Sequence, residues 1–523
     1  MKTTCSLSSP ARWTTITPLL AIAISLAVGP PAWAASASEL LEQGIYAEET
    51  KGDLDAALQL YKQAVSEAKA TRAVASQAQF RLGVCYYKKK ESAAAMAAFE
   101  QLVRDFPEQK ELVAQAGDYL FRALPLLAAP WEDGEELRFD LKPPGGPKCG
   151  SVTATVNAGE TNGQRLWLVG EQDAVLFFTD SIKRVEVDAA TFKPLRSRRT
   201  ARVGGEVDTV YLSGKAEVKV KGQAEAKHAW LPGAVYDDYE LFDLIRRLPL
   251  AANYSVSLFS AGMKGMSGDR SPEPNKLQVV GVEKVQVPAG TYECFKVEIG
   301  TNSSAWYSTG SRRYPVKFQN NGPGWPVELA AVNRRPAGEP AQYRDPGLGF
   351  SLTAPPGWLI DRYAGEDASA AVRSLANAGG LEQGLAQLLL SLWNDLKAEI
   401  TLCILNPEPT SLCWANVARL ESLKGNARQS PRAWAEENLA RATKVLTDLQ
   451  VRTNGWQQLT AAGQSAVSAI GDCGQGDYRM TAYGVWIFDN SNAVNFCFAS
   501  APKDFERLRP SFDALVHSYT RSQ

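Results

Sequence analysis

The stretch ELRFDL, residues 136–141, marks a change in the spacing of apolar residues along the chain. Its apolar residues Leu137, Phe139 and Leu141 alternate with polar ones and therefore share one face of a strand. Before this stretch the apolar spacing is helical, and after it alternating runs recur between turns rich in Gly, Asp and Asn. The change predicts a multidomain α+β protein in which a short helical array precedes an antiparallel β-rich domain.

The β-rich domain is predicted over residues 131–332. Runs such as SVTATVNA (151–158) and RLWLV (165–169) alternate apolar and polar residues, which is typical of an antiparallel meander. One helix is expected inside the domain, at YDDYELFDLIRRLPL (236–250). Acidic residues at its start suit the helix dipole, and an apolar stripe follows them.

Four phrases of this domain resemble a family of uncharacterised exported β-sheet domains. They are WEDGEELRFDL (131–141), VEVDAATFKPLRS (185–197), VPAGTYECFKVEI (287–299) and AWYSTGSRRYPVKF (305–318). The resemblance implies a half-barrel-like sheet of the kind that cradles lipid or lipoprotein acyl chains in the bacterial envelope. Two interpretations remain open: the concave side holds an apolar ligand, or the protein's own helix and side chains fill it.

The helical array is predicted over residues 38–125, and its clearest part is LGVCYYKKKESAAAMAAFEQLVRDFP (82–107). The second copy of its repeat carries Gly83, Tyr86, Ala95, Phe99 and Pro107, and an earlier copy carries Ala57, Tyr61 and Ala64. The glycine lets two helices approach closely, the aromatic residues fill the space between them, and the proline ends the second helix. On these residues the segment resembles a tetratricopeptide-repeat protein.

The resemblance implies a groove that binds a protein or peptide. A helix at ELVAQAGDYLFRALPLL (111–127) is expected to cap the array. Two copies are fewer than a free-standing solenoid of such repeats needs. A short helical spacer that packs on the neighbouring domain is therefore an equal alternative.

The C-terminal region begins after residues 333–347, which are rich in Pro, Arg and Gly and predict a linker. Residues 348–520 resemble PsbP-like domains through GFSLTAPPGWLI (349–360), a hairpin in GVWIFDNSNAVNFCFASA (484–501) and a final helix at FERLRPSFDALVHSYT (505–520). The resemblance implies an α/β/α sandwich built on an antiparallel sheet, and binding or assembly rather than catalysis.

Two further helices are expected in this region. Ser430 and Pro431 have the residue types preferred at the N-cap and first position of a helix. The insertion SLANAGGLEQGLAQLLLSLW (374–393) has the pattern of an added amphipathic helix.

The cysteines predict three disulfides, because an exported protein can form them. Folding TLCILNPEPTSLCW (401–414) about Glu408 places Cys403 opposite Cys413. Cys473 and Cys497 would then pair by elimination, and Cys149 and Cys294 are the two cysteines of the middle region. Cys85 is expected to be an unpaired residue in the helix interface.

The first 34 residues predict an export signal. Lys2 and Arg12 precede an apolar stretch from Ile16 to Val28, and Ala32-Trp33-Ala34 supplies a small-x-small cleavage pattern. No later stretch is apolar enough to span a bilayer. The protein is therefore expected to be exported to the periplasm or outside the cell, with no transmembrane span in the mature chain.

The composition excludes several classes of function. A formal net charge of −1 gives no overall attraction to nucleic acid. The chain has only two histidines, His228 and His517, so a histidine triad or a histidine-rich zinc site is excluded. Asp237, Asp238 and Glu240 are interpreted as helix-capping acids. We therefore expect no enzymatic activity, no cofactor and no metal.

Taken together, these patterns predict an exported, non-enzymatic binding or scaffold protein of the bacterial cell envelope. Its helical repeats would bind a protein partner, which the sequence does not identify. The alternative function is a carrier or sensor of a lipid or other apolar ligand held in the central β-domain.

Overall fold

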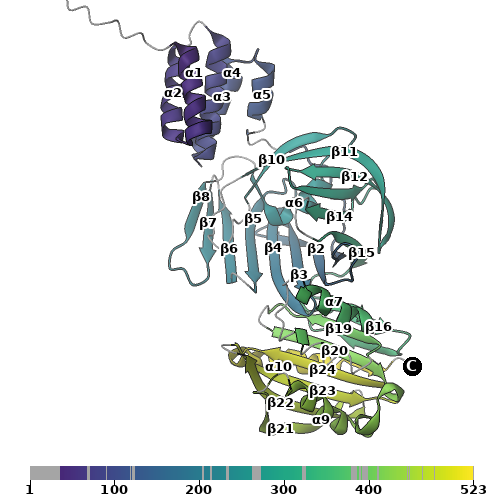
Figure 1. Ribbon diagram of the computed structural model, residues 1–523. Coiled ribbons are helices and arrows are strands. Elements are labelled where there is room, and N and C mark those ends of the chain that lie inside the picture. The colour runs from purple at the N-terminus through teal and green to yellow at the C-terminus, as the bar shows by residue number, and fades with distance from the viewer. Residues whose placement is uncertain are drawn as a thin grey trace, which may run out of the picture. The chain divides into compact units, whose positions relative to one another are not determined.

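The computed structural model describes residues 36–521 except 68–70, 90, 118, 121–123, 203–204, 213–214, 231–234, 262–272, 321–324, 378–385, 388–389, 391–397, 409–410, 445, 447, 462 and 476–477. The predicted export signal and most of the predicted insertion helix lie outside the described residues. The chain is mixed α and β, with helices first and large antiparallel sheets after them (Figure 1). It divides into two compact units, Met1–Leu82 and Gly83–Gln523.

The first unit contains α1 (Ala37–Ile45), the π-helical segment η1 (Tyr46–Lys51), α2 (Leu54–Glu67) and the start of α3 (Arg72–Lys88). Ser36 caps α1 through a reciprocal capping box with Glu39. In α2 the three repeat residues Ala57, Tyr61 and Ala64 are fully buried. A Cβ atom added to Gly44 would lie 2.5 Å from Cε1 of Tyr61, so the helices approach closely at this glycine.

The second unit begins with the end of α3, α4 (Ser92–Asp105) and α5 (Lys110–Gly117). Here a Cβ atom on Gly83 would lie 2.6 Å from Cε1 of Phe99, which repeats the relation between Gly44 and Tyr61. Ala95 and Phe99 are buried, Tyr86 is half-buried, and Pro107 follows the end of α4. The two copies therefore share one packing device.

The first copy is one residue longer than the second between its glycine and its aromatic residue. The π-helical turn of η1 lies within this interval and absorbs the additional residue. It also turns the Glu48 side chain inward, where Glu48 accepts a hydrogen bond of 2.7 Å from Tyr61 and an ion pair of 3.2 Å from Arg81. The inserted residue is thus accommodated by a buried polar contact.

The predicted cap helix ends earlier than expected. Helix α5 stops at Gly117, and residues 124–130 have no regular structure. Leu124 and Leu126 instead pack against the apolar cluster of the central sheet. Pro125 lies in this irregular stretch, which suits a residue that has no backbone N–H for a helical hydrogen bond.

The central module is one fifteen-stranded sheet whose strands follow the order β8-β7-β6-β5-β4-β3-β2-β1-β15-β14-β13-β12-β11-β10-β9. All described neighbours are antiparallel except β9 and β10. The strands are β1 (Glu135–Leu141), β2 (Gly150–Thr161), β3 (Gln164–Val175), β4 (Phe178–Asp188), β5 (Pro194–Ala201), β6 (Gly205–Leu212), β7 (Lys215–Val220), β8 (Lys227–Trp230), β9 (Val235–Asp237), β10 (Ser255–Ala261), β11 (Glu273–Val287), β12 (Gly290–Ile299), β13 (Ser303–Ser308), β14 (Pro315–Asn320) and β15 (Val327–Arg334).

This sheet bends around the short helices η2 (Asp238–Glu240) and α6 (Leu241–Arg246) (Figure 1). One apolar cluster joins α6 to strands of both halves of the sheet, including Val169 of β3 and Val297 of β12. The edge strand β9 also packs against β5 of the other half, and its Val235 belongs to the same apolar cluster as Ala216 of β7. The module's own residues therefore fill much of the concave side.

Arg246 anchors α6 in that position. Its guanidinium is fully buried and pairs with Glu135 at 2.7 Å and Asp243 at 2.9 Å, and it lies 5.0 Å from the ring centroid of Trp131. Burying this cation without both carboxylates would cost several kcal/mol, on the order of 3–5. The arginine therefore fixes the helix to the start of β1.

The C-terminal module contains a three-stranded sheet, β16-β17-β25, and a seven-stranded sheet, β18-β19-β20-β24-β23-β22-β21. Its strands are β16 (Gln342–Asp345), β17 (Phe350–Thr353), β18 (Leu359–Ala364), β19 (Ile400–Leu405), β20 (Ser411–Arg419), β21 (Gln450–Ala461), β22 (Gln464–Gln475), β23 (Tyr478–Phe488), β24 (Asn492–Ser500) and β25 (Thr520–Arg521), and its helices are α7 (Gly365–Asn377), η3 (Leu420–Ser422), η4 (Gly425–Arg428), α9 (Pro431–Ala442) and α10 (Pro502–His517).

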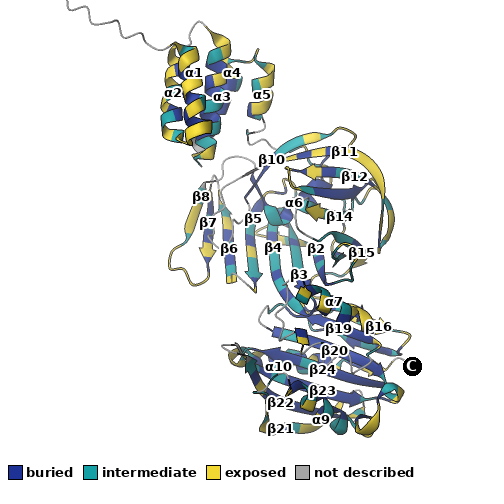
Figure 2. Ribbon diagram, in the orientation of Figure 1, coloured by how far each residue is buried: buried dark blue, intermediate teal, exposed yellow. Residues whose placement is uncertain are grey.

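Both faces of the seven-stranded sheet are covered. Phe505, Leu508, Phe512 and Leu515 of α10 pack on one face. Helices α7 and α9 pack on the other, and the predicted cap Ser430 accepts a hydrogen bond from the backbone N–H of Ala433. Figure 2 shows β20 and β24 largely buried, whereas the edge strand β21 is mostly exposed.

Two parts of the predicted linker differ from expectation. Arg334 still belongs to β15, and Gln342–Asp345 form β16, which pairs with β17. Tyr343 and Leu348 pack against the apolar cluster beneath α10. A composition rich in Pro, Arg and Gly therefore does not mark an independent linker here. The start of the segment belongs to the central sheet, and residues 342–345 belong to the three-stranded sheet.

None of the three predicted disulfides is formed among the described cysteines. The β19–β20 register pairs Cys403 with Trp414 rather than with Cys413. The Asn406 side chain sets this register by accepting hydrogen bonds from Glu408 N–H and the Ser411 hydroxyl. A slip of one residue moves a side chain to the opposite face of a sheet, so the two sulfurs are separated.

The other two pairs fail for topological reasons. Cys473 lies on β22 and Cys497 on β24, with β23 between them. Cys149 packs where the central and C-terminal modules meet, whereas Cys294 packs in a separate cluster of the central sheet. Cys85 is fully buried, as expected of a core residue.

Candidate functional site

The candidate site is the junction of the central and C-terminal modules, where residues more than 200 positions apart in the sequence are in contact. Its apolar part is the tip of the β3–β4 hairpin, formed by Leu176 and Phe177, which we call the plug. Both side chains are buried in the cluster that also contains α7, α9 and Trp414. The ring centroids of Phe177 and Trp414 are 5.1 Å apart. A central-module turn thus completes the core of the C-terminal module.

The plug has an unusual backbone. Leu176 has a φ of 52°, in the left-handed region that favours glycine. A two-residue hairpin normally uses Asn-Gly or a similar pair at this position. An apolar residue in this conformation costs roughly 1–2 kcal/mol, which the burial of the leucine and phenylalanine side chains offsets. The turn is therefore built for contact with another module rather than with water.

Polar contacts border the plug. The hydroxyl of Thr179 donates a buried hydrogen bond of 2.8 Å to the backbone carbonyl of Asn406. Cys149 packs in the same cluster, and burial raises the pKa of its thiol. The cysteine is therefore a packing residue rather than a nucleophile at neutral pH.

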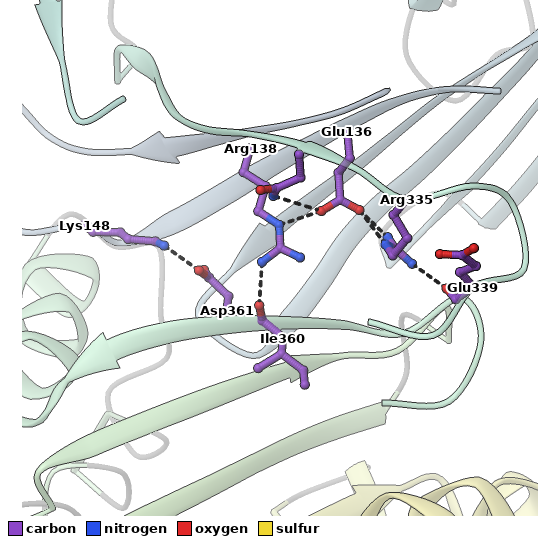
Figure 3. A network of polar contacts seen from close by, with 8 residues as sticks. Glu136, Arg138, Lys148, Arg335, Glu339, Ile360 and Asp361 are labelled. Atoms are coloured by element: carbon purple, nitrogen blue, oxygen red, sulfur yellow. Dashed lines mark hydrogen bonds and ion pairs between the residues drawn. The ribbon is translucent and has the colours of Figure 1, made fainter. Parts of the chain in front are cut away.

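The polar part of the junction is carried by the second face of β1, and we call it the latch. Glu136 accepts hydrogen bonds from Nε of Arg138 at 2.8 Å and Nε of Arg335 at 2.7 Å (Figure 3). Arg138 continues across the junction and donates from Nη1 to the carbonyl of Ile360 at 2.9 Å. Arg335 donates in turn to the carbonyl of Glu339 at 3.1 Å.

Burial and charge oppose each other at Glu136, whose side chain is only 2% exposed. Burial alone would raise the pKa of this carboxyl, but Arg138 and Arg335 hold the pKa below its ordinary value. Glu136 is therefore a carboxylate at neutral pH. Its charge orients the two arginines that connect the modules.

Lys148 makes the second charged connection in the latch. Its ammonium lies 2.5 Å from Asp361 of the C-terminal module (Figure 3). It also lies 3.1 Å from Asp140 of β1. Burial alone would lower the pKa of Lys148, but the two carboxylates raise it above its ordinary value. The ammonium also lies 5.0 Å from the ring centroid of Tyr363. The lysine therefore remains charged and bridges the two modules.

A cavity of about 200 Å³ lies beside the latch. The central module lines it with side chains that include Arg138, Asp140, Ser151 and Thr153. The C-terminal module contributes Tyr343, Ile360, Asp361 and Arg362 among others. The cavity exists only where the two modules meet.

Some ionisable groups outside the junction make local structural contacts. Asp237 and Glu240 form the capping box of η2, as the sequence indicates for acids at a helix start. His228 is an exposed residue of β8, and the His517 ring lies at the end of α10 with Nδ1 2.6 Å from the carbonyl of Asp513. Among the described residues, no group of three or more His, Cys, Asp or Glu side chains could hold a metal ion.

One buried charge cluster lies on the sheet of the central module. Lys183 forms ion pairs with Glu171 and with Asp173, the latter at 2.9 Å. Burial and the neighbouring Asp173 raise the pKa of Glu171 to about 7, while Lys183 opposes this shift. These groups satisfy one another, and their lysine packs 5.7 Å from the ring centroid of Tyr239. We therefore assign them to the packing of η2 on the sheet.

Sequence reasoning missed both parts of the junction. The plug has a signal, the uninterrupted apolar run AVLFF (174–178) at a position where a hairpin turn should be polar. The latch has none, because Glu136, Arg138 and Asp140 are the polar positions of an alternating strand and look like an ordinary solvent-facing set. The predicted repeat residues lie in the helices, except Pro107, which follows the end of α4, and the predicted disulfide cysteines are dispersed among the cores.

The central concave side does not support the interpretation in which it holds an apolar ligand. A cavity of about 260 Å³ beside α6 mixes apolar side chains such as Phe242 and Phe318 with Asp238, Ser260 and Asn275. The hydroxyl of Ser260 accepts a hydrogen bond of 2.6 Å from the Asn275 amide. The filled cluster around α6 favours the interpretation in which the sheet packs on its own helix.

Family models match two parts of the chain. The model described as a protein of unknown function, DUF3108, matches residues 138–322, which is most of the central module. The tetratricopeptide repeat model matches residues 77–108, which hold the second repeat copy. No curated protein matches the chain.

Three solved structures illustrate the remaining similarity. The PsbP protein of Synechocystis sp. PCC 6803 (CyanoP) is 12% identical over 35% of this chain and 93% of its own, with a TM-score of 0.25. LpqN, involved in cell envelope biogenesis of Mycobacterium tuberculosis, is 14% identical over 35% and 90%, with a TM-score of 0.22. MucB is 10% identical over 75% and 94%, with a TM-score of 0.15. At these TM-scores the likenesses carry no structural or functional argument.

No helix of the described residues is sufficiently long and apolar to cross a membrane.

Proposed function

We propose that this chain is an exported, non-enzymatic scaffold of the bacterial cell envelope that binds a protein partner through its helical repeats. The observation that carries the proposal is the tetratricopeptide match at residues 77–108. The close approach of Gly83 to Phe99 supports it, because this packing holds the helices of a repeat pair together. Proteins built from such repeats use the surface of the stacked helices to bind other proteins.

The first repeat copy offers a contact residue for the partner. Tyr46 begins η1 and is 54% exposed, although large aromatic side chains are usually buried. The matching position of the second copy is Cys85, which is fully buried. Exposed tyrosines are enriched among residues that dominate protein–protein binding energy. Tyr46 is therefore the residue on which we place the docking of the partner.

The central and C-terminal modules would form the scaffold part of the protein. The plug and the latch join these two modules to each other, so that they act as one unit rather than as two loosely tethered domains. No enzymatic step is proposed, because the junction's ionisable groups are committed to ion pairs and its cysteine is a packing residue.

The test is affinity capture of the full chain and of two variants from an envelope extract, followed by titration of the recovered protein. Tyr46→Ala should weaken binding of that partner at least tenfold, which corresponds to roughly 1.4 kcal/mol. Gln59→Ala, at an exposed position of α2, is the matched control and should bind like the parent chain. Equal binding by both variants, or the absence of any saturable partner, would contradict the proposed function.

Export is tested separately by cell fractionation and by the intact mass of the recovered protein. The proposal expects the protein in the envelope fraction with its chain starting after Ala34. Recovery of the full-length chain from the cytoplasm would remove the exported part of the proposal and leave protein binding to be judged by the capture experiment.

A further inference from the structure

Two carboxylates share one lysine on the concave side of the central sheet, where η2 packs on β3 and β4. Glu171 and Asp173 of β3 both form ion pairs with Lys183 of β4. The three side chains are between 18% and 27% exposed. When both acids are ionised, the cluster therefore carries one uncompensated negative charge in a largely enclosed place, which is costly.

The neighbouring strands do not supply the missing positive charge beside Glu171. The residue of β2 that faces Glu171 is Ala154, and Ser181 of β4 donates only a neutral hydrogen bond, of 2.6 Å, to the aspartate of the cluster. The next cation is Arg199 of β5, which follows Lys183 in the sheet. It lies two strands from Glu171, which is about 10 Å between backbones.

The segment that packs on the cluster adds further acids. The ring centroid of Tyr239 in η2 lies 5.7 Å from the ammonium of the cluster, and Asp237 and Asp238 come directly before this tyrosine. Glu240 ends the same short helix, and burial together with Asp237 raises its pKa well above the ordinary value. An ionised Glu171 therefore faces a segment that is itself rich in acids, and the two repel each other.

Uptake of one proton removes this excess charge. Burial and the neighbouring Asp173 raise the pKa of Glu171 to about 7, although Lys183 opposes the shift. The two carboxylates raise the pKa of Lys183 above its ordinary value, so the lysine stays charged. An acid whose pKa is raised on folding stabilises the folded state fully below its ordinary pKa, and this stability is lost as the pH rises through the folded-state pKa. The cluster is therefore most stabilising in mild acid.

From this arrangement we propose that Glu171, Asp173 and Lys183 form a pH-sensitive clasp on η2. The clasp holds the segment while its two carboxylates share a proton, and it loosens the segment when that proton leaves. The loosened segment carries Asp238 and leads into Phe242, and both residues line the cavity of about 260 Å³ beside α6. The clasp therefore controls how open this cavity is. It is separate from the helical repeats, so its test does not depend on partner binding.

The test is hydrogen exchange of the full chain at pH 6 and pH 8. The protection of the amides of η2 and α6 is divided by that of the amides of β24 in the C-terminal module, which removes the general effect of pH on exchange. This ratio should be about tenfold higher at pH 6 than at pH 8, because the clasp takes up its proton between these values. His228 and His517, the only histidines of the chain, are exposed and contribute little in this range. A ratio that is equal at both pH values, or lower at pH 6, would overturn the proposal.

A pair of variants assigns the effect to the clasp. Glu171→Gln keeps the size of the side chain but carries no charge, so the tenfold difference between pH 6 and pH 8 should disappear. Glu160→Gln makes the same chemical change at an exposed position of β2 and should keep the difference seen in the parent chain.

A second variant covers the case in which Glu171→Gln does not fold. Asp173→Asn removes the other carboxylate and leaves Glu171 alone with Lys183, which lowers the pKa of the glutamate and should also abolish the difference. A tenfold difference that persists in either folded variant would place the titrating group elsewhere and refute the clasp.

Discussion

The plug and the latch join the same two modules by different physical means. The plug buries apolar side chains around Phe177, and its contribution comes mainly from removing them from water. The latch holds the charges of Glu136, Arg138 and Lys148 in fixed pairs, which offset the cost of burying those charges. The plug therefore supplies most of the docking energy, whereas the latch sets the orientation in which the modules dock.

Phe177→Ala should have the largest effect, because it empties the centre of the plug. Truncating a phenylalanine that is 1% exposed costs about 3–5 kcal/mol of unfolding free energy. Chemical denaturation should show the C-terminal module unfolding in a separate, earlier transition.

Phe192→Ala is the control, since Phe192 is equally buried but packs only in the central module. It should lower the stability by a similar amount without detaching the C-terminal module. If both variants unfold in the same way, the plug has no special part in docking.

Glu136→Gln should have the next largest effect, about 2–3 kcal/mol, because Arg138 and Arg335 would lose their shared carboxylate. The pKa of Glu136 in the folded chain is below its ordinary value, because the folded state stabilises the ionised carboxylate. That stabilisation is present above the ordinary pKa and is lost as the pH falls through the lower, folded-state pKa.

Unfolding experiments between neutral and acidic pH check this prediction. The difference in unfolding free energy between the parent chain and Glu136→Gln should be greatest at neutral pH. It should shrink as the pH falls through the lower, folded-state pKa of Glu136. A difference that does not change with pH would mean that the glutamate acts through packing and not through its charge.

Thr179→Val should cost about 1 kcal/mol, because the carbonyl of Asn406 would lose a buried hydrogen bond. Thr209→Val is the matched variant within the central module. The hydroxyl of Thr209 is buried without a described partner, so its removal should leave the stability unchanged or raise it. Thermal unfolding of both variants compares their losses of stability. A loss in Thr179→Val alone would come from the hydrogen bond across the junction and not from the removal of a buried hydroxyl.

Arg362→Gln should have the smallest effect, less than about 0.5 kcal/mol. The Arg362 side chain is 49% exposed, and its ion pair with Asp345 is long at 3.9 Å. Denaturation at low and high salt should give nearly the same midpoint as the parent chain. A loss as large as that of Glu136→Gln would show that burial does not rank the charged contacts in and around the junction.

Local sequence patterns predicted the helices and strands of this chain more reliably than they predicted which residues those elements pair with. The helix at Ser430, the helix around α6 and the final helix follow from caps and apolar stripes that lie within a few residues of one another. The hairpin at residues 401–414 was also predicted, but its register was wrong by one residue. A turn held by the side chain of Asn406 decides that register, and a single position decides which face a cysteine occupies.

The sequence by itself determined the helical repeat, the change to a period of two at ELRFDL, and the face of β1 on which Leu137 and Phe139 are buried. These properties depend on neighbours along the chain. Only the tertiary structure decided what lies against the other face of the same strand. Glu136 and Arg138 have the pattern of a solvent-facing pair, and they acquire a role because a segment more than 200 residues away, at Ile360, supplies the acceptor. Contacts of that range leave no local periodicity, so charge and alternation alone could not reveal them.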